Sequence, residues 1–286
     1  MSQTTAQQIT PELRQWIVEQ AQASHPPEAV LKSMIASGWA EDVAIAAMEA
    51  TLAEHIDADS KLRGFPPAAA VPDLPMSDSP LYIDAGDRKV QVLTSMSRPR
   101  IIVFGNLLSD VECDALIAAA RPRLARSLTV QTQTGGEEIN IDRTSSGMFF
   151  ARGEIDVIAR LEARIARLVN WPVENGEGLQ ILHYQPGAEY KPHYDYFDPD
   201  AAGTPGIVAR GGQRVATLIM YLNEPEKGGG TVFPDVHLEV APKRGNAVFF
   251  NYERPHPMTK SLHGGAPVIE GEKWIATKWL RVGRFD

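Results

Sequence analysis

The sequence predicts an α+β protein: a β-rich body with flanking helices, preceded by a small helical module. Short runs rich in β-branched and aromatic residues recur from residue 179 to 282, separated by Gly, Pro and Asn. This pattern indicates a β-sandwich or β-barrel. Apolar residues at helical spacing fill residues 10–56, and prolines crowd residues 66–80. We therefore expect a helical module (1–60), a proline-rich connector with the first strands (61–96) and a main domain (97–286).

The composition fits a globular chain. Of 286 residues, 43% are apolar and 22% are charged, which is enough for a sizeable core. The formal net charge of −8 argues against nucleic acid or an anionic membrane as a partner. The single cysteine, Cys113, excludes an intramolecular disulfide and a cysteine-based metal site. Neither a signal-peptide pattern nor a long apolar run is present, so we expect a cytoplasmic location.

Three helices are expected in the first module. Thr10 can cap a helix that has Pro11 at its first position, and a second helix follows Pro27. A third runs from about Asp42 to Ile56. Three short helices bury only a small core, so the module suits homodimerisation, partner binding or a structural cap. The proline-rich segment after it is either a linker or a strap on the surface.

The main domain should begin with strands and two helices. Ser109, followed three residues later by Glu112, predicts a capping box that opens a helix ending near Pro122. A second helix with one apolar face spans about 154–170. The runs expected to be strands are 81–84, 89–94, 100–105, 179–185, 190–197, 214–222, 231–233, 237–241, 246–252, 260–263 and 272–282.

The sharpest signal for chemistry is His193-Tyr194-Asp195. On a strand, residues i and i+2 point to the same face, so His193 and Asp195 can offer a nitrogen and an oxygen to one metal ion. A third ligand is needed, and His263 is the best candidate. Two histidines and one carboxylate on a triangular face suit non-haem Fe(II) and leave open positions for substrates and O₂.

Three other histidines compete for a ligand role. His237 belongs to a His-x-Glu pair between two prolines, close in sequence to His263. His256 is flanked by prolines in an expected loop. His183 alternates with apolar residues, which favours a core histidine with a hydrogen-bond partner. We rank all three below His263.

Lys273 indicates an anion site. It follows His263 by ten residues, and strand alternation places Lys273, Thr277 and Trp279 on one face. A lysine buried near a metal needs a carboxylate partner, because desolvating an unpaired charge is costly. A dicarboxylate such as 2-oxoglutarate can chelate iron with one end and meet Lys273 with the other. The alternative is an edge-strand lysine that faces water.

Several motifs occur together between residues 97 and 283, about two thirds of the chain. They are HYQPG at 183–187, HYDYF at 193–197, GGQR at 211–214, ATLIMYL at 216–222, GGGTVFP at 228–234, and the segments 99–104, 109–113 and 143–147, with His263 and Lys273. This combination resembles the prolyl 4-hydroxylase family of Fe(II)/2-oxoglutarate-dependent dioxygenases. Residues 1–80 fall outside the resemblance.

The resemblance implies a double-stranded β-helix, or jelly roll, that uses Fe(II), 2-oxoglutarate and O₂, with ascorbate to rescue over-oxidised iron. It implies His193, Asp195 and His263 as iron ligands and Lys273 as the partner of the 2-oxoglutarate C5 carboxylate. The other cosubstrate positions are Tyr184, Thr217 and Trp279, and the positions near the substrate groove are Tyr190, Arg143, Ser145 and Arg214.

The resemblance also implies hydroxylation of prolyl residues in a peptide or protein, with release of succinate and CO₂. A free cyclic amino acid, proline or pipecolate, is an alternative substrate. An alternative from another class is a non-catalytic jelly-roll sensor, but a binder has no reason to keep the triad together with Lys273. The segment 199–210 is longer than in many family members, which leaves the substrate open.

Overall fold

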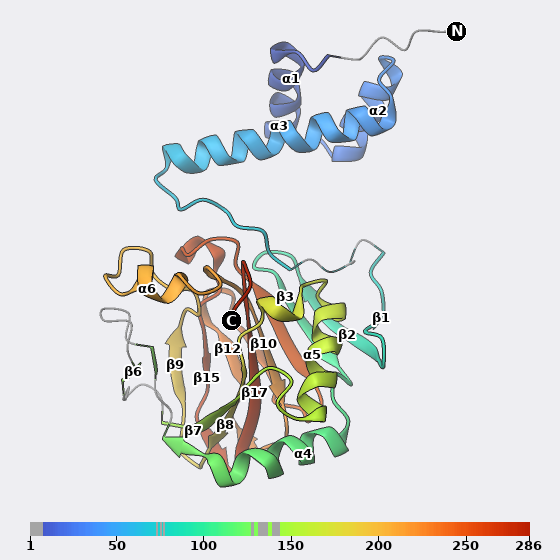
Figure 1. The fold of residues 1–286 in the computed structure, drawn as a ribbon. Helices are drawn as coiled ribbons and strands as arrows, with labels where there is room; N and C mark the ends of the chain where they lie inside the picture. The colour runs from blue at the N-terminus through green and yellow to red at the C-terminus, as the bar shows by residue number, and fades with distance from the viewer. Residues whose placement is uncertain are drawn as a thin grey trace. The chain divides into compact units, whose positions relative to one another are not determined.

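The computed structural model, shown in Figure 1, describes residues 8–72, 74, 76, 78–126, 129–130, 137–138 and 144–286. Packing divides the chain into one unit that ends at Ala68 and a second unit over Ala69–Asp286. The expected boundaries at residues 60 and 96 stay predictions. Among the described residues, no helix combines the length and the apolar character that a membrane crossing requires.

The first unit holds α1 (Pro11–Gln22), α2 (Pro27–Ala36) and α3 (Glu41–Leu62). The Thr10 hydroxyl accepts a hydrogen bond from Leu13 N at 3.3 Å, so the predicted cap is present. The helix α3 extends six residues beyond its predicted end at Ile56. Ion pairs at i, i+4 spacing, Lys61 with Asp57 and Arg63 with Asp59, support these last turns. The core of the unit is Ile17, Val30, Met34, Ala44, Ala47 and Met48.

A nine-stranded antiparallel sheet forms the base of the second unit, in the order β1-β2-β3-β14-β10-β17-β8-β7-β4. Its strands are β1 (Tyr82–Asp84), β2 (Lys89–Met96), β3 (Ile101–Gly105), β4 (Ala125–Arg126), β7 (Ser146–Phe150), β8 (Leu179–Tyr184), β10 (Arg214–Tyr221), β14 (Ala247–Asn251) and β17 (Lys273–Arg281). Strands that are far apart in sequence are thereby neighbours, as a jelly roll requires.

A four-stranded sheet, in the order β13-β12-β15-β9, packs against one face of the large sheet. Its strands are β9 (Tyr190–His193), β12 (Thr231–Phe233), β13 (Leu238–Val240) and β15 (His263–Gly265). Two further pairs are β11 (Lys227–Gly228) with β16 (Val268–Glu270) and β5 (Thr129–Val130) with β6 (Glu137–Glu138). The two packed sheets confirm the expected double-stranded β-helix.

Helices cover the opposite face of the large sheet. These two helices are α4 (Asp110–Ala120) and α5 (Asp156–Leu168). The other helices described in this unit are short: α6 (Thr204–Val208), η1 (Arg121–Arg123), η2 (Val173–Asn175), η3 (Pro234–Val236) and η4 (Pro257–Thr259). The predicted capping box of α4 is formed: Ser109 and Glu112 hydrogen-bond reciprocally at 3.3 and 2.9 Å. Strand β10 alternates accordingly, with Leu218 toward the helices and Ile219 toward the small sheet.

Part of the proline-rich connector is packed against the second unit. Ala69 N donates to Glu253 O at 2.7 Å, and Asn251 Nδ2 donates to Pro72 O at 3.1 Å. Leu74 is buried in the core shared by the helices and the large sheet. At Ala69, Pro72 and Leu74 the connector is therefore a strap on the surface of this unit and not a free linker.

Candidate metal and cosubstrate site

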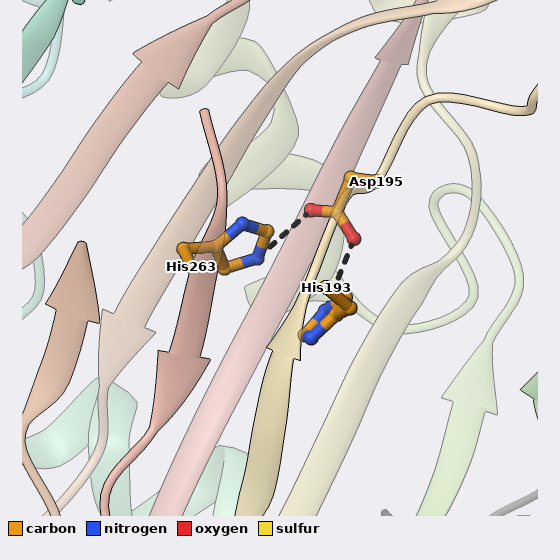
Figure 2. Close-up of side chains that lie close together, drawn as sticks. All are labelled: His193, Asp195 and His263. Carbon is orange, nitrogen blue, oxygen red and sulfur yellow. Dashed lines mark ion pairs between the residues drawn. The ribbon is translucent and has the colours of Figure 1, made fainter. Parts of the chain in front are cut away.

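His193, Asp195 and His263 lie together between the two sheets, as Figure 2 shows. Antiparallel pairing of β9 with β15 places His193 opposite His263, and Asp195 follows β9 by two residues. Asp195 Oδ1 lies 3.5 Å from His193 Nε2, and Asp195 Oδ2 lies 3.4 Å from His263 Nε2. One donor atom from each residue lies within 4.8 Å of the others, so a single ion can contact all three.

Neighbouring groups orient these three side chains. His193 Nδ1 bonds Lys191 O at 2.9 Å, and His263 Nδ1 bonds Ser261 O at 3.0 Å. Because a carbonyl only accepts, each Nδ1 carries the proton and each Nε2 presents its lone pair. The Thr217 hydroxyl donates to Asp195 Oδ2 at 2.7 Å and fixes the carboxylate. Two nitrogens and one oxygen on one face are the donor set of non-haem Fe(II) sites.

The local electrostatics favour the forms that bind a metal. Burial opposes ionisation of Asp195, but His263 and His193 outweigh it and hold the pKa of that carboxyl well below its usual range. Burial lowers the pKa of His193, and the neighbouring His263 adds to this effect. At neutral pH the site therefore offers an ionised carboxylate and a neutral His193 imidazole.

The cavity around the triad extends along β17 to Lys273. Lys273, Thr277 and Trp279 all line it, as strand alternation predicted. Lys273 is 2% exposed, and its Nζ lies 5.4 Å from the centre of the Tyr184 ring, the register partner on β8. Burial lowers the pKa of Lys273 to about 8, although the charge of Glu239 opposes this. Among the described residues none forms an ion pair with Lys273, so the cavity holds a buried cation that needs an anion.

Thr217 lies away from Lys273. On β10 it pairs with Trp279, six residues along β17 from Lys273, and its hydroxyl lies 2.9 Å from Tyr252 Oη as well as bonding Asp195. The threonine at the Lys273 end of the cavity is Thr231 on β12. A Cβ placed on its register partner, Gly265, would lie 3.8 Å from Lys273 Nζ.

Thr217 therefore contacts Asp195, whereas Thr231 lies at the Lys273 end of the cavity, and the contact of Thr217 with the C5 carboxylate stays a prediction. The signal that could have found Thr231 is its place after Gly228, Gly229 and Gly230, where a chain without side chains can approach a ligand closely. Tyr184 and Trp279 do line the cavity, and their contacts with a cosubstrate stay predictions.

Of the four residues predicted to lie near the substrate groove, one lines the cavity. Tyr190 lines the cavity and stacks on His193, with 3.7 Å between ring centres. Arg214 instead packs against Trp279, with its guanidinium 3.9 Å from the centre of that ring. It donates hydrogen bonds to both carboxylate oxygens of Glu177, at 2.6 and 2.8 Å. It is thus a buried ion-pair residue and not a cavity wall. Ser145 is buried and is not among the described lining residues, and Arg143 lies outside the described residues.

The histidines ranked below His263 lie elsewhere. His183 is buried, bonds Glu272 at 2.6 Å and stacks on Trp274, which confirms a core histidine with a partner. His256 accepts a hydrogen bond from Met258 N at the start of η4. In the described part of the chain the triad is the single group of three or more such side chains arranged to hold a metal.

The jelly roll, the triad and the buried lysine together define a 2-oxoglutarate- and Fe(II)-dependent dioxygenase. Residues 179–281 match the family model of the 2OG-Fe(II) oxygenase superfamily. Prolyl 4-hydroxylase 5 of Arabidopsis thaliana is 42% identical over 221 residues, which cover 70% of this chain and 74% of the relative. Prolyl 4-hydroxylase 2 of the same plant is 40% identical over 215 residues, covering 66% and 70%.

A solved structure agrees. A viral collagen prolyl hydroxylase from Paramecium Bursaria Chlorella virus-1, in its 2-oxoglutarate complex, is 33% identical, with a TM-score of 0.50. The match covers 63% of this chain and 95% of the viral chain. The chain therefore belongs to the prolyl 4-hydroxylase family of 2-oxoglutarate- and Fe(II)-dependent oxygenases, and its cofactors are Fe(II), 2-oxoglutarate and O₂.

Proposed function

We propose that this chain hydroxylates prolyl residues in a peptide or protein. The observation that carries the proposal is the triad of His193, Asp195 and His263 in one cavity with the buried Lys273. When bound, iron and 2-oxoglutarate supply the chemistry that inserts one atom of O₂ into an unactivated C–H bond, as 2-oxoglutarate becomes succinate and CO₂. The prolyl substrate is supported by the names of the relatives.

The residues of the chain hold and shield the reactants. We assign His193 Nε2, one Asp195 oxygen and His263 Nε2 to iron, and Lys273 to the distal carboxylate of 2-oxoglutarate, with Thr231 beside it. Aromatic and aliphatic walls, including Tyr184, Tyr190, Ile219 and Trp279, keep the reacting centre away from bulk water. Ascorbate is expected to restore iron that oxidises without substrate.

A peptide substrate fits the cavity better than a free cyclic amino acid. A free amino acid carries an ammonium and a carboxylate, and both need partners when they are buried. Apart from the triad, Lys273 is the one charged side chain among the described residues that line the cavity. If Lys273 holds the cosubstrate, no described lining residue is left to neutralise a zwitterion. A peptide places its terminal charges outside the cavity.

The test compares four compounds with purified full-length protein, Fe(II), 2-oxoglutarate and ascorbate. They are a proline-rich peptide, the same peptide with alanine for proline, free proline and free pipecolate. We expect succinate release and the added mass of one oxygen atom with the proline peptide only. The double variant His193→Ala, His263→Ala is the control and should release none. Equal turnover with a free amino acid would contradict the peptide proposal.

The same samples separate catalysis from a binding role. Anaerobic titration with Fe(II) and 2-oxoglutarate should produce an absorption band from the iron–cosubstrate chelate. A protein that shows no band and releases no succinate would be the non-catalytic sensor.

Two further expectations are proposals that rest on the sequence. We propose a cytoplasmic location, which cell fractionation tests. We also propose that α1–α3 mediate either self-association or partner binding. Size-exclusion chromatography with light scattering of the full chain separates a monomer from a homodimer.

A further inference from the structure

A tyrosine outside the cavity wall contacts Thr231. Tyr221, the last residue of β10, is fully buried in the core between the two sheets. Its hydroxyl donates to Thr231 Oγ1 at 2.8 Å. Among the described residues this is the hydroxyl's one hydrogen-bond partner. Burial raises the pKa of Tyr221, so the phenol stays protonated and remains a donor at any pH in which the enzyme works.

Thr231 is placed between this phenol and the anion end of the cavity. It is 2% exposed, it lines the cavity, and its register partner Gly265 adjoins Lys273 Nζ. A threonine hydroxyl has one proton to donate and rotates freely unless a neighbour fixes it. Because Tyr221 occupies an acceptor position of Oγ1, the hydroxyl proton must point elsewhere.

We propose that Tyr221 is a positioning residue for the cosubstrate: its hydroxyl orients the Thr231 hydroxyl so that Thr231 donates to the distal carboxylate of 2-oxoglutarate, next to Lys273. The inference rests on the placement of 2-oxoglutarate proposed above. The two hydrogen bonds then run in one direction, from Tyr221 to Thr231 to the carboxylate, and each polarises the next. A tyrosine that served packing alone would not need its oxygen, because phenylalanine fills the same space.

The experiment uses Tyr221→Phe, Thr231→Val and the double variant in the full-length chain loaded with Fe(II). Anaerobic titration gives the Kd for 2-oxoglutarate and for 2-oxobutyrate, a 2-oxo acid that lacks the distal carboxylate. Tyr221→Phe should raise the Kd for 2-oxoglutarate about three- to tenfold, and Thr231→Val at least as much. In the Thr231→Val background, Tyr221→Phe should add less than about twofold, because the residue acts through Thr231.

The Kd for 2-oxobutyrate should not change in Tyr221→Phe, since that ligand makes no contact at the Lys273 end. A role in packing would instead weaken both ligands equally, and that result would overturn the inference. So would independent, additive effects of the two substitutions, or a 2-oxoglutarate Kd within twofold of the parent. Thr231→Ser keeps the hydroxyl and should retain most of the affinity, which gives a second test if Thr231→Val folds poorly.

Lys273→Met distinguishes the failure of this inference from the failure of the proposed site. If Lys273→Met weakens 2-oxoglutarate binding but Tyr221→Phe and Thr231→Val do not, the orienting role is wrong and the placement stands. If none of the three substitutions changes the 2-oxoglutarate Kd, the placement of the cosubstrate is itself wrong.

Discussion

Replacing Lys273 with methionine should stabilise the fold and weaken cosubstrate binding at the same time. Burial lowers the pKa of Lys273 from 10.5 to about 8. At about 1.4 kcal/mol per pH unit, the charged ammonium costs the ligand-free fold about 3 kcal/mol at neutral pH. Methionine has a similar length and no charge, so the free energy of unfolding should rise by about 2–3 kcal/mol.

The same substitution removes the charge that meets the distal carboxylate. Hydrogen bonds to charged groups contribute about 1.5–3 kcal/mol, so the KM for 2-oxoglutarate should rise about ten- to hundredfold. Urea denaturation of the metal-free protein measures the first effect, and succinate formation measures the second. The direction of the pH dependence also follows from the lowered pKa. As pH rises from 8 to 10.5, folded wild type loses the buried charge of Lys273, so its free energy of unfolding should rise relative to that of the variant.

Lys278→Met is the matched control. Lys278 lies on the same strand and is equally buried, but it donates to Glu162 at 2.5 Å. Its removal leaves the Glu162 carboxylate buried without a cation, with Gly153 N as its remaining donor among the described residues, and should destabilise the fold by about 3 kcal/mol. A loss of stability in Lys273→Met as large as in Lys278→Met, or an unchanged KM for 2-oxoglutarate, would refute the reasoning.

Three further predictions concern pH, stability and the metal. The KM for 2-oxoglutarate should rise above pH 8, as Lys273 loses its charge in the free enzyme, and Lys273→Met should lack this rise; a flat wild-type profile contradicts it. Burial opposes ionisation of Glu112, but Arg164 and Ser109 lower its pKa from 4.5 to about 2. Glu112→Gln should therefore lower the free energy of unfolding by about 3 kcal/mol in urea denaturation at neutral pH. This difference in stability between wild type and variant should disappear as pH falls from 4.5 toward 2, and a difference that persists near pH 2 contradicts the prediction. Thr217→Val should weaken iron binding about tenfold in chelator competition, because Thr217 holds Asp195; unchanged iron affinity contradicts it.

Local signals in the sequence sufficed for the helix starts and for two of the three metal-site residues, His193 and Asp195. Thr10 and Ser109 cap helices through bonds to residues three positions away, which sequence spacing alone specifies. His193 and Asp195 share a face by strand alternation. The position of His263 beside them could be predicted only from the family resemblance or from an assumed topology, because β9 and β15 are distant in the chain and their pairing has no local signal.

The remaining site residues depend on register between distant strands. Thr217 and Thr231 both lie in strand-like runs, and only the pairing of β10 with β17 places Thr217 opposite Trp279, away from Lys273. The resemblance placed Arg214 near the substrate groove, but Glu177 binds its guanidinium in the interior. The sequence around Thr217 or Arg214 alone predicts neither of these placements.

The central claim is that the triad and Lys273 form one site that hydroxylates a prolyl residue. Mass spectrometry of a proline-rich peptide, incubated with the full-length protein, Fe(II), 2-oxoglutarate and isotopically labelled O₂, tests it most directly. We predict one labelled oxygen atom on proline for each succinate released, and none with the His193→Ala, His263→Ala variant. Succinate release without labelled peptide, or labelling that survives loss of both histidines, would contradict the claim.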